Sequence, residues 1–147
     1  MFHADASQLR RLGAELRKTR PEVHRAVRRS VLEQAKKIAE DAKTKADWST
    51  RIPGTIRASS SGVNTAVVRA GGPSAPHAAA YEHAGAEGTF RHPVYGRGDE
   101  TRDQWTWVSE QARPFLHPAL MDRFEETVTA LRDAVEVAVS DVIDRKV

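Results

Sequence analysis

The chain has 147 residues and no cysteine, and its 23 Lys and Arg side chains face 20 Asp and Glu side chains. This length suits one domain, and the missing thiols exclude disulfides, iron–sulfur clusters and thiolate zinc sites. No run of about 18 apolar residues could span a bilayer, and the first residues lack the order of a secretory signal. We therefore expect an intracellular protein that does not contact a membrane.

The charge is unevenly distributed along the chain. Residues 1–57 hold 14 Lys and Arg against 7 Asp and Glu, a net +7, whereas residues 58–147 hold 9 against 13, a net −4. Such polarity favours head-to-tail contacts between subunits or proximity of one end to nucleic acid. Ordinary solvated helix faces would give the same counts, so both interpretations stay open.

The first third of the chain predicts two helices. Leu9, Leu12 and Leu16 recur at helical spacing and indicate a helix over about 5–19. Pro21 stands where a first-turn proline belongs and is predicted to open a second helix over about 21–46. One face of that helix is apolar and the opposite face is basic, with Arg25, Arg28, Arg29, Lys36, Lys37 and Lys43.

A β-rich region is predicted over about 50–110. The runs "TIRAS" and "TAVVRAG" are β-prone and flank "SSGVN", which indicates a hairpin. A loop from residue 73 should then run into a short helical turn through Glu82. "GTFRHPVYG" predicts a strand that is interrupted or ended at Pro93, since proline cannot donate to a sheet. "QWTWV" predicts another strand, with Trp105 and Trp107 on one face.

The last element is predicted to be a long helix over about 118–146, opened by Pro118. Its apolar positions recur every three or four residues: Leu120, Phe124, Val128, Leu131, Val135, Val139 and Val142. The order of elements indicates the α+β class in a single domain, 1–147. We expect a small antiparallel sheet with a hairpin, packed against the long N-terminal and C-terminal helices.

Four residues invite a metal-site hypothesis: His77, Glu82, His83 and His92. They lack the i, i+4 pair of a helical zinc site, so we favour surface or interface histidines. No G-x-S-x-G elbow, P-loop or dinucleotide fingerprint is present. We therefore expect no enzyme, no catalytic residue, no cofactor and no metal, and a metal-dependent enzyme using these four residues is kept as an alternative.

Several short motifs in a fixed order carry a family resemblance. The segments are "SAPHAAAYEHAG", "FRHPVYG", "WV" and "QARPFLHPAL", followed by the long C-terminal helix. Together they resemble the tail-component family of long-tailed phages, the head–tail connector or tail-completion proteins of lambda-like siphophages. The matching positions are Tyr81 with "HAG" at 83–85, then His92, Pro93, Tyr95 and Gly96, and finally Pro114, Phe115, Leu116, Pro118 and Ala119.

This resemblance implies a structural virion protein that forms a homo-oligomeric ring in the neck between head and tail, with a hexamer as the expected stoichiometry. It implies assembly in the host cytoplasm, contact with a head-closure (stopper) protein and with a tail terminator or major tail protein, and genomic DNA passing through the lumen without sequence-specific binding. A tail terminator or another neck or minor tail protein would also fit. A small DNA-associated protein that uses the basic second helix is the alternative from another class.

Aromatic side chains and two loops are the candidate contact residues. The loops 59–64 and 96–103 are expected to reach adjacent rings. Side chains predicted to lie at a subunit interface or to pack the sheet against the helices are Phe90, His92, Tyr95, Trp105, Trp107 and Phe115.

Overall fold

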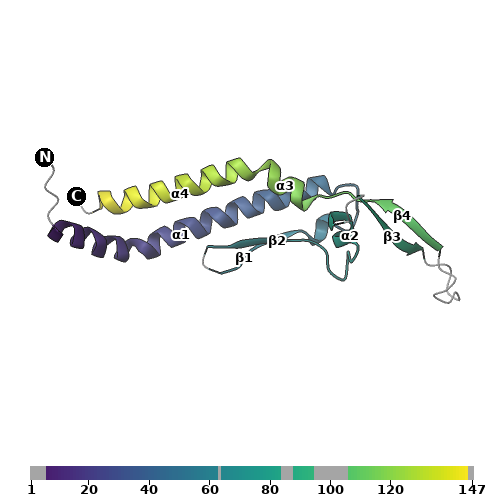
Figure 1. Ribbon diagram of the computed structural model, residues 1–147, viewed down its shortest axis with the longest axis horizontal. Coiled ribbons are helices and arrows are strands. Elements are labelled where there is room, and N and C mark those ends of the chain that lie inside the picture. The colour runs from purple at the N-terminus through teal and green to yellow at the C-terminus, as the bar shows by residue number, and fades with distance from the viewer. Residues whose placement is uncertain (1–5, 63, 84–87, 95–105, 146–147) are drawn as a thin grey trace. The chain divides into compact units, whose positions relative to one another are not determined.

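The computed structural model describes residues 6–62, 64–83, 88–94 and 106–145, and the side chains from residue 21 onward (Figure 1). In chain order the elements are α1 (Ala6–Lys45), the 3₁₀ helix η1 (Pro53–Thr55), β1 (Arg57–Ser60), β2 (Ala66–Arg69), α2 (Ala78–His83), β3 (Thr89–Val94), β4 (Thr106–Gln111), α3 (Leu116–Asp122) and α4 (Phe124–Asp144). Helices and antiparallel strands are thus combined, which confirms the α+β class. The strands form two separate two-stranded sheets, β1-β2 and β3-β4, instead of one.

Contacts divide the chain into two compact units. Unit 1 comprises residues 1–36, 58–67 and 124–147, and unit 2 comprises residues 37–57 and 68–123. Helix α1 contributes its first part to unit 1 and its last part to unit 2. Each unit is described by itself below, and a single domain over 1–147 stays a prediction.

The two predicted N-terminal helices are one continuous helix, α1, with Pro21 inside it. The prediction of a break between 19 and 21 was therefore wrong. A proline inside a helix leaves the carbonyl four residues earlier without its usual donor, at a cost of about 3 kcal/mol. The flanking sequence is rich in Leu, Arg, Ala and Glu, which favour helix on both sides and carry it through the proline.

The predicted C-terminal helix is instead two helices, α3 and α4, separated at Arg123. Arg123 has φ −105° and ψ 6°, and its N–H donates to the carbonyls of Leu120 and Met121, which closes the last turn of α3. Its side chain donates to Asp41 of α1, with a distance of 3.1 Å between Nη2 and Oδ1. Helical spacing of apolar residues continues across this junction, so periodicity alone could not reveal it.

The predicted hairpin over 55–71 is confirmed as β1 and β2. At its turn the Ser61 N–H donates to the Thr65 carbonyl at 2.8 Å. The strand predicted to stop near Pro93 continues through that residue, which lies opposite Trp107 in the β3–β4 ladder. Because β3 has a single neighbouring strand, a residue without an N–H is tolerated there.

Unit 2 has a small core of fully buried side chains. Phe115 and Ile52 are both 0% exposed. Buried alanines come from the end of α1 (Ala42, Ala46), from the start of α2 and the segment before it (Ala75, Ala78) and from α3 (Ala119). The small alanine side chains allow these short elements to approach closely.

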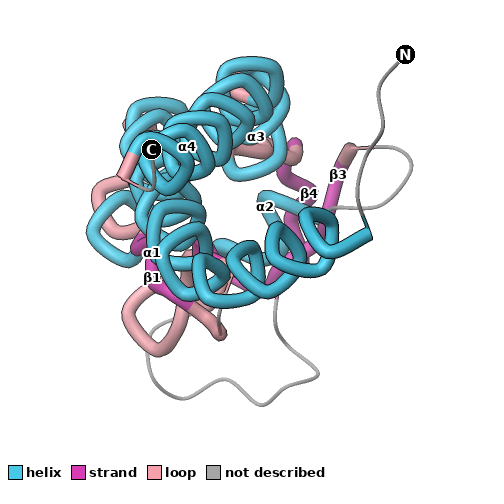
Figure 2. The backbone as a smooth tube through the Cα atoms, turned by 90° about the vertical axis from the view of Figure 1, so that its left-hand side faces the viewer, coloured by secondary structure: helices cyan, strands magenta, loops and turns pink. Residues whose placement is uncertain are grey.

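Unit 1 is built on the first part of α1 and on α4, which lie side by side and antiparallel (Figures 1 and 2). The hydroxyl of Ser30 donates to the Ala130 carbonyl at 3.3 Å and joins the two helices. Among the described side chains of this unit, the buried ones are Ser30, Gln34, Ala35, Ala138 and Val142. Among the helices that the structure describes, none is both long and apolar enough to cross a membrane.

Candidate functional site

Tyr81 is the centre of an aromatic cluster in unit 2. Its ring centroid lies 4.6 Å from that of Trp48, 4.8 Å from that of Phe90 and 5.9 Å from that of His77. The contacts with Phe90 and His77 are edge-to-face, a favoured arrangement of aromatic rings. Helix α2 produces the cluster, because Tyr81 follows His77 by one helical turn and faces the same side.

Strand alternation brings Phe90 and His92 to the face of β3 that meets this cluster. Glu110 of β4 lies opposite Phe90. Its Oε2 accepts the Tyr81 hydroxyl at 2.5 Å and lies 3.3 Å from Nε2 of His92. Glu110 was not predicted as a site residue. The position of Glu110 opposite Phe90 follows from the register of β3 and β4. The sequence does not fix this register, because it does not show where β3 ends and β4 begins.

The opposite face of the β3–β4 hairpin is exposed to solvent. Trp107 is 51% exposed and lies opposite Pro93. The guanidinium of Arg91 lies 6.0 Å from the centroid of the Trp107 ring, within the range of a cation–π contact. This face therefore offers an open aromatic side chain beside a cation.

The other predicted contact residues have different positions. Phe115 is fully buried, so in this chain it packs the core of unit 2 and is not open to a neighbour. Tyr95, Trp105 and the loop 96–103 lie outside the described residues. In the loop 59–64, Asn64 is exposed and hydrogen bonds through its side chain to His24 of α1 at 3.2 Å.

Glu82 has a structural role that the sequence did not reveal. Its Oε2 accepts the backbone N–H groups of Phe115 and Leu116 at 2.8 and 2.9 Å, and its Oε1 accepts that of His117 at 2.7 Å. The first N–H groups of a helix have no partner within the helix, so a carboxylate at this position stabilises the start of α3. The Glu82 side chain thus connects α2 to α3.

The four residues of the metal hypothesis are not brought together. Glu82 bonds to α3, His92 contacts Glu110, and His83 is exposed. In the described ranges, no group of three or more His, Asp or Glu side chains could hold a metal ion.

Two titratable groups of unit 2 are shifted. The hydrogen bond from Arg123 lowers the pKa of Asp41, partial burial opposes this, and the charges of Arg123 and Lys45 add to the lowering. Burial raises the pKa of Tyr81 to about 12, and the hydrogen bond to Glu110 and its charge act in the same direction. Both shifts arise from contacts that hold unit 2 together.

The predicted basic face of α1 is partly occupied by protein contacts. Nε of Arg28 donates to Oγ of Ser60 at 3.2 Å, and Nζ of Lys43 lies 2.7 Å from Oε1 of Glu40. Lys36 and Lys37 are exposed. Arg25 and Arg29 line a hollow of about 460 Å³ in unit 1 together with Glu22, Ala138, Asp141 and Arg145. Acidic groups therefore alternate with the cations.

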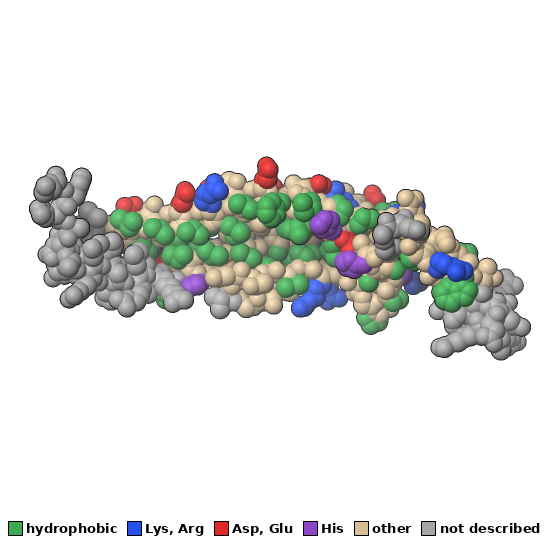
Figure 3. All heavy atoms as spheres, viewed as in Figure 1, with side chains coloured by type: hydrophobic (Ala, Val, Ile, Leu, Met, Phe, Trp, Pro, Cys, Tyr) green, Lys and Arg blue, Asp and Glu red, His purple; other side chains and the backbone are tan. Residues whose placement is uncertain are grey.

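Helix α4 exposes part of its predicted apolar stripe. Phe124 is 54% exposed, Val128 40% and Val135 37%, whereas Val142 is buried. Val137 and Ile143 are exposed as well. Figure 3 shows hydrophobic side chains along this helix. Phe124, Val128 and Val135 recur at helical spacing on one side of α4, and open apolar side chains on one side of a helix are typical of an interaction surface.

Comparisons of the chain with protein-family models, with curated proteins and with solved structures found no match.

Proposed function

We propose that the chain is a structural virion protein of a tailed phage, a ring-forming subunit of the head–tail connector that joins head-closure and tail proteins around the DNA channel. The observation that carries this proposal is the apolar surface of α4, where Phe124, Val128 and Val135 are open to solvent. When a neighbouring subunit covers such a surface, its apolar side chains are removed from water, and this burial stabilises the assembly.

The positions of the family-like motifs support the proposal. Tyr81 is the centre of the aromatic cluster, His92 joins it through Glu110, and Phe115 fills the core of unit 2. Three of the residues that carry the resemblance, Tyr81, His92 and Phe115, thus contribute contacts or burial within unit 2. A shared fold would require these side chains at these positions.

Ring closure requires two different complementary surfaces on each subunit. The chain has two candidates of distinct chemistry. One is the apolar surface of α4, and the other is the open face of the β3–β4 hairpin with Trp107 and Arg91. Aromatic and arginine side chains are enriched in the centre of protein interfaces, which favours the second surface as a contact.

The second candidate function is a small DNA-associated protein, favoured by exposed cations on one side of α1, including Arg25, Arg29 and Lys36. Arg28 and Lys43 of the same predicted face are bound to protein groups. Phosphate contacts need open cations in a row, so this arrangement supports DNA binding less than it supports self-association.

Native mass spectrometry and electron microscopy of the full chain, alone and with head-closure and tail-tube proteins, test the proposal. We expect closed rings for the native sequence. Val128→Glu should prevent them while circular dichroism shows unchanged helix content. Thr129→Glu places the same charge on an exposed polar position of α4 and should leave ring formation intact.

Two results would contradict the connector function. The first is a chain that stays monomeric at high concentration and with both neck partners present. The second is a mobility-shift assay in which DNA binding is strong and falls steeply with salt, with no ring formed.

A further inference from the structure

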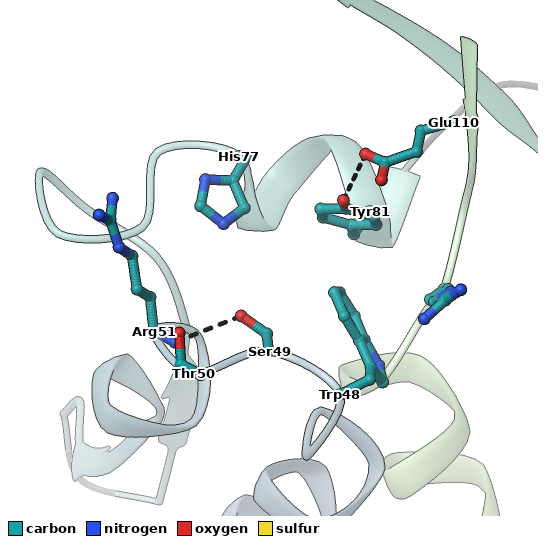
Figure 4. A pocket seen from close by; sticks show the side chains of 8 residues that line it. Trp48, Ser49, Thr50, Arg51, His77, Tyr81 and Glu110 are labelled. Carbon is teal, nitrogen blue, oxygen red and sulfur yellow. Dashed lines mark hydrogen bonds between the residues drawn. The ribbon is translucent and has the colours of Figure 1, made fainter. Parts of the chain in front are cut away.

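Unit 2 contains an open pocket of about 400 Å³, lined by residues of four segments (Figure 4). The segment after α1 contributes one wall, and α2 with the residue before it contributes another. The lining residues are Trp48, Ser49, Thr50, Arg51, His77, Tyr81, Glu110 and Arg113. In Figure 4 the side chains of Arg51, His77 and Tyr81 surround the same hollow.

The pocket has two guanidinium groups that no carboxylate pairs with in the described part of the chain. Arg51 is exposed, and its backbone N–H donates to Oγ of Ser49 at 3.3 Å. Arg113 lies over the Trp48 ring, with 5.4 Å between its Cζ and the ring centroid. A guanidinium presents five N–H donors, so both retain donors for a ligand.

The carboxylate in the pocket is already engaged. Glu110 accepts the Tyr81 hydroxyl at 2.5 Å and lies 3.3 Å from Nε2 of His92. Its charge is therefore held on the side of the aromatic cluster, and two arginines against one glutamate leave the pocket with an excess of positive charge. This excess favours an anionic ligand.

The aromatic residues do not offer a platform for a nucleic-acid base. The Trp48 ring contacts Tyr81 at 4.6 Å between centroids and carries the Arg113 guanidinium. Its indole N–H donates to the Lys45 carbonyl at 3.0 Å. Single-stranded nucleic acid is bound by stacking on open aromatic faces, and Trp48 is occupied by its neighbours.

The polar groups fit a carboxylate side chain attached to a peptide. Planar guanidinium groups match the two oxygens of a carboxylate. Glu110 would repel a doubly charged phosphate more than a singly charged carboxylate, and it can accept N–H groups of a peptide backbone. The Ser49 and Thr50 hydroxyls add groups that both donate and accept.

We propose that this pocket binds an acidic side chain of an extended peptide segment from a protein partner, with Arg51 and Arg113 as the anion-binding residues. This binding site goes beyond the connector function and does not depend on it.

The test is a titration of the isotopically labelled full chain, followed by amide and arginine side-chain NMR signals. The probes are the acidic peptide acetyl-GEGEG-amide, its uncharged counterpart acetyl-GQGQG-amide, inorganic phosphate and a thymidine decanucleotide. We expect saturable shifts of the signals of Ser49, Arg51 and Arg113 with the acidic peptide alone, at a dissociation constant on the order of 1 mM.

Substitutions separate a specific site from general attraction. Arg51→Gln should weaken binding about tenfold, the effect of losing a charge-assisted hydrogen bond. Arg69→Gln removes the same charge from an exposed position of β2 outside the pocket and should change binding less than twofold. Unchanged signals elsewhere would show that the variants remain folded.

Four outcomes would overturn the proposal. They are equal binding of the charged and uncharged peptides, equal losses for the two arginine variants, shifts of the same signals by phosphate or the decanucleotide without an effect of the acidic peptide, and no binding of any probe.

Discussion

Units 1 and 2 are stabilised by different interactions. Unit 1 relies on two long helices, α1 and α4, joined by the bond from Ser30 to the Ala130 carbonyl, and side chains such as Val27 and Leu131 are half-buried on them. The side chains that are both large and fully buried, Phe115 and Ile52, belong to unit 2. Among the described residues of unit 1, Oε1 of Gln34 and Oγ1 of Thr127 are buried oxygens without a hydrogen-bond partner.

Unit 2 consists of short elements that cannot be stable alone. Helices α2 and α3 have 6 and 7 residues, below the length at which isolated helices form. Polar contacts fix the short elements of unit 2. Glu82 of α2 accepts N–H groups at the start of α3, and Arg123 after α3 donates to Asp41 of α1. The Gly71 N–H donates to the Thr55 hydroxyl at 2.8 Å and connects η1 to the segment before α2.

This difference suggests a division of roles. Long helices satisfy their own backbone groups, so α4 can leave apolar side chains open for a partner. Short elements need contacts with the rest of their unit, and the polar side chains of unit 2 provide these contacts. All three tryptophans lie in residues assigned to unit 2, so tryptophan fluorescence reports on unit 2 and helical circular dichroism reports on both units.

The largest expected effect comes from truncating a phenylalanine in each unit. Phe115→Ala should lower the free energy of unfolding of unit 2 by about 3 to 5 kcal/mol, because a fully buried ring leaves a cavity. Phe124→Ala, at a side chain that is 54% exposed, should cost less than about 1 kcal/mol. Urea denaturation followed by tryptophan fluorescence measures the effect of Phe115→Ala, and urea denaturation followed by circular dichroism measures the effect of Phe124→Ala. Equal losses would refute the contrast between the two units.

The next effect tests the polar anchor. Glu82→Gln keeps the shape of the side chain and removes its charge, so the free energy of unfolding should fall by about 1.5 to 3 kcal/mol. Hydrogen exchange of the Phe115, Leu116 and His117 amides should accelerate at the same time. Glu136→Gln, at an exposed position of α4, serves as the control. Unchanged exchange at the start of α3 would show that Glu82 does not anchor it.

A smaller effect is expected at Tyr81. Its pKa of about 12 means that the folded chain favours the neutral phenol, so this contribution to stability is present below pH 10 and is lost as the pH rises toward 12. Ultraviolet titration should show this phenol, and Tyr81→Phe should remove its step. Glu110→Gln should lower the midpoint of the Tyr81 titration, while the part of the pKa shift that is due to burial should remain. A midpoint near 10 in the native chain would contradict the contact.

The smallest effect is the pH dependence at Asp41. Its lowered pKa means that the bond to Arg123 contributes stability above the unfolded value of about 3.8, and that this is lost as the pH falls through the folded pKa. The stability difference between the native chain and Asp41→Asn should be at most about 1 kcal/mol at neutral pH, because the pair is partly exposed. It should shrink in acid. Asp133→Asn, on the exposed side of α4, should show no such change.

Local patterns predicted the class of the fold and most elements. The hairpin over 55–71, the turn through Glu82 and the strand at 89–94 follow from residues close in sequence. The uninterrupted α1 did not, because the local rule for Pro21 competes with helix-favouring residues on both sides. The break at Arg123 depends on Asp41, which lies 82 residues earlier.

The candidate site was predicted less completely. Phe90 was identified as an aromatic side chain and His92 from the His-Pro segment of the family-like motif, and the structure places the two rings 6.1 Å apart, with Phe90 against Tyr81. Glu110 and the pocket residue Arg51 were not identified. The position of Glu110 depends on the strand register, and that of Arg51 depends on tertiary contacts. The histidine-rich stretch suggested a metal site, and the contacts of Glu82 with three backbone amides explain that residue without one.

The hydrogen bonds of Glu82 with the backbone at the start of α3 also affect which changes in chain length unit 2 can accept. Glu82 binds residues 33 to 35 positions later, and the Arg113 N–H donates to the Tyr81 carbonyl at 3.2 Å. Within unit 2, the chain therefore leaves α2 for the β3–β4 hairpin and returns to α3 at positions that these hydrogen bonds hold together. Lengthening a loop whose ends are already held together costs little free energy. The connection between β3 and β4 can accordingly change in length, provided that Phe90 and Glu110 keep their contacts with Tyr81.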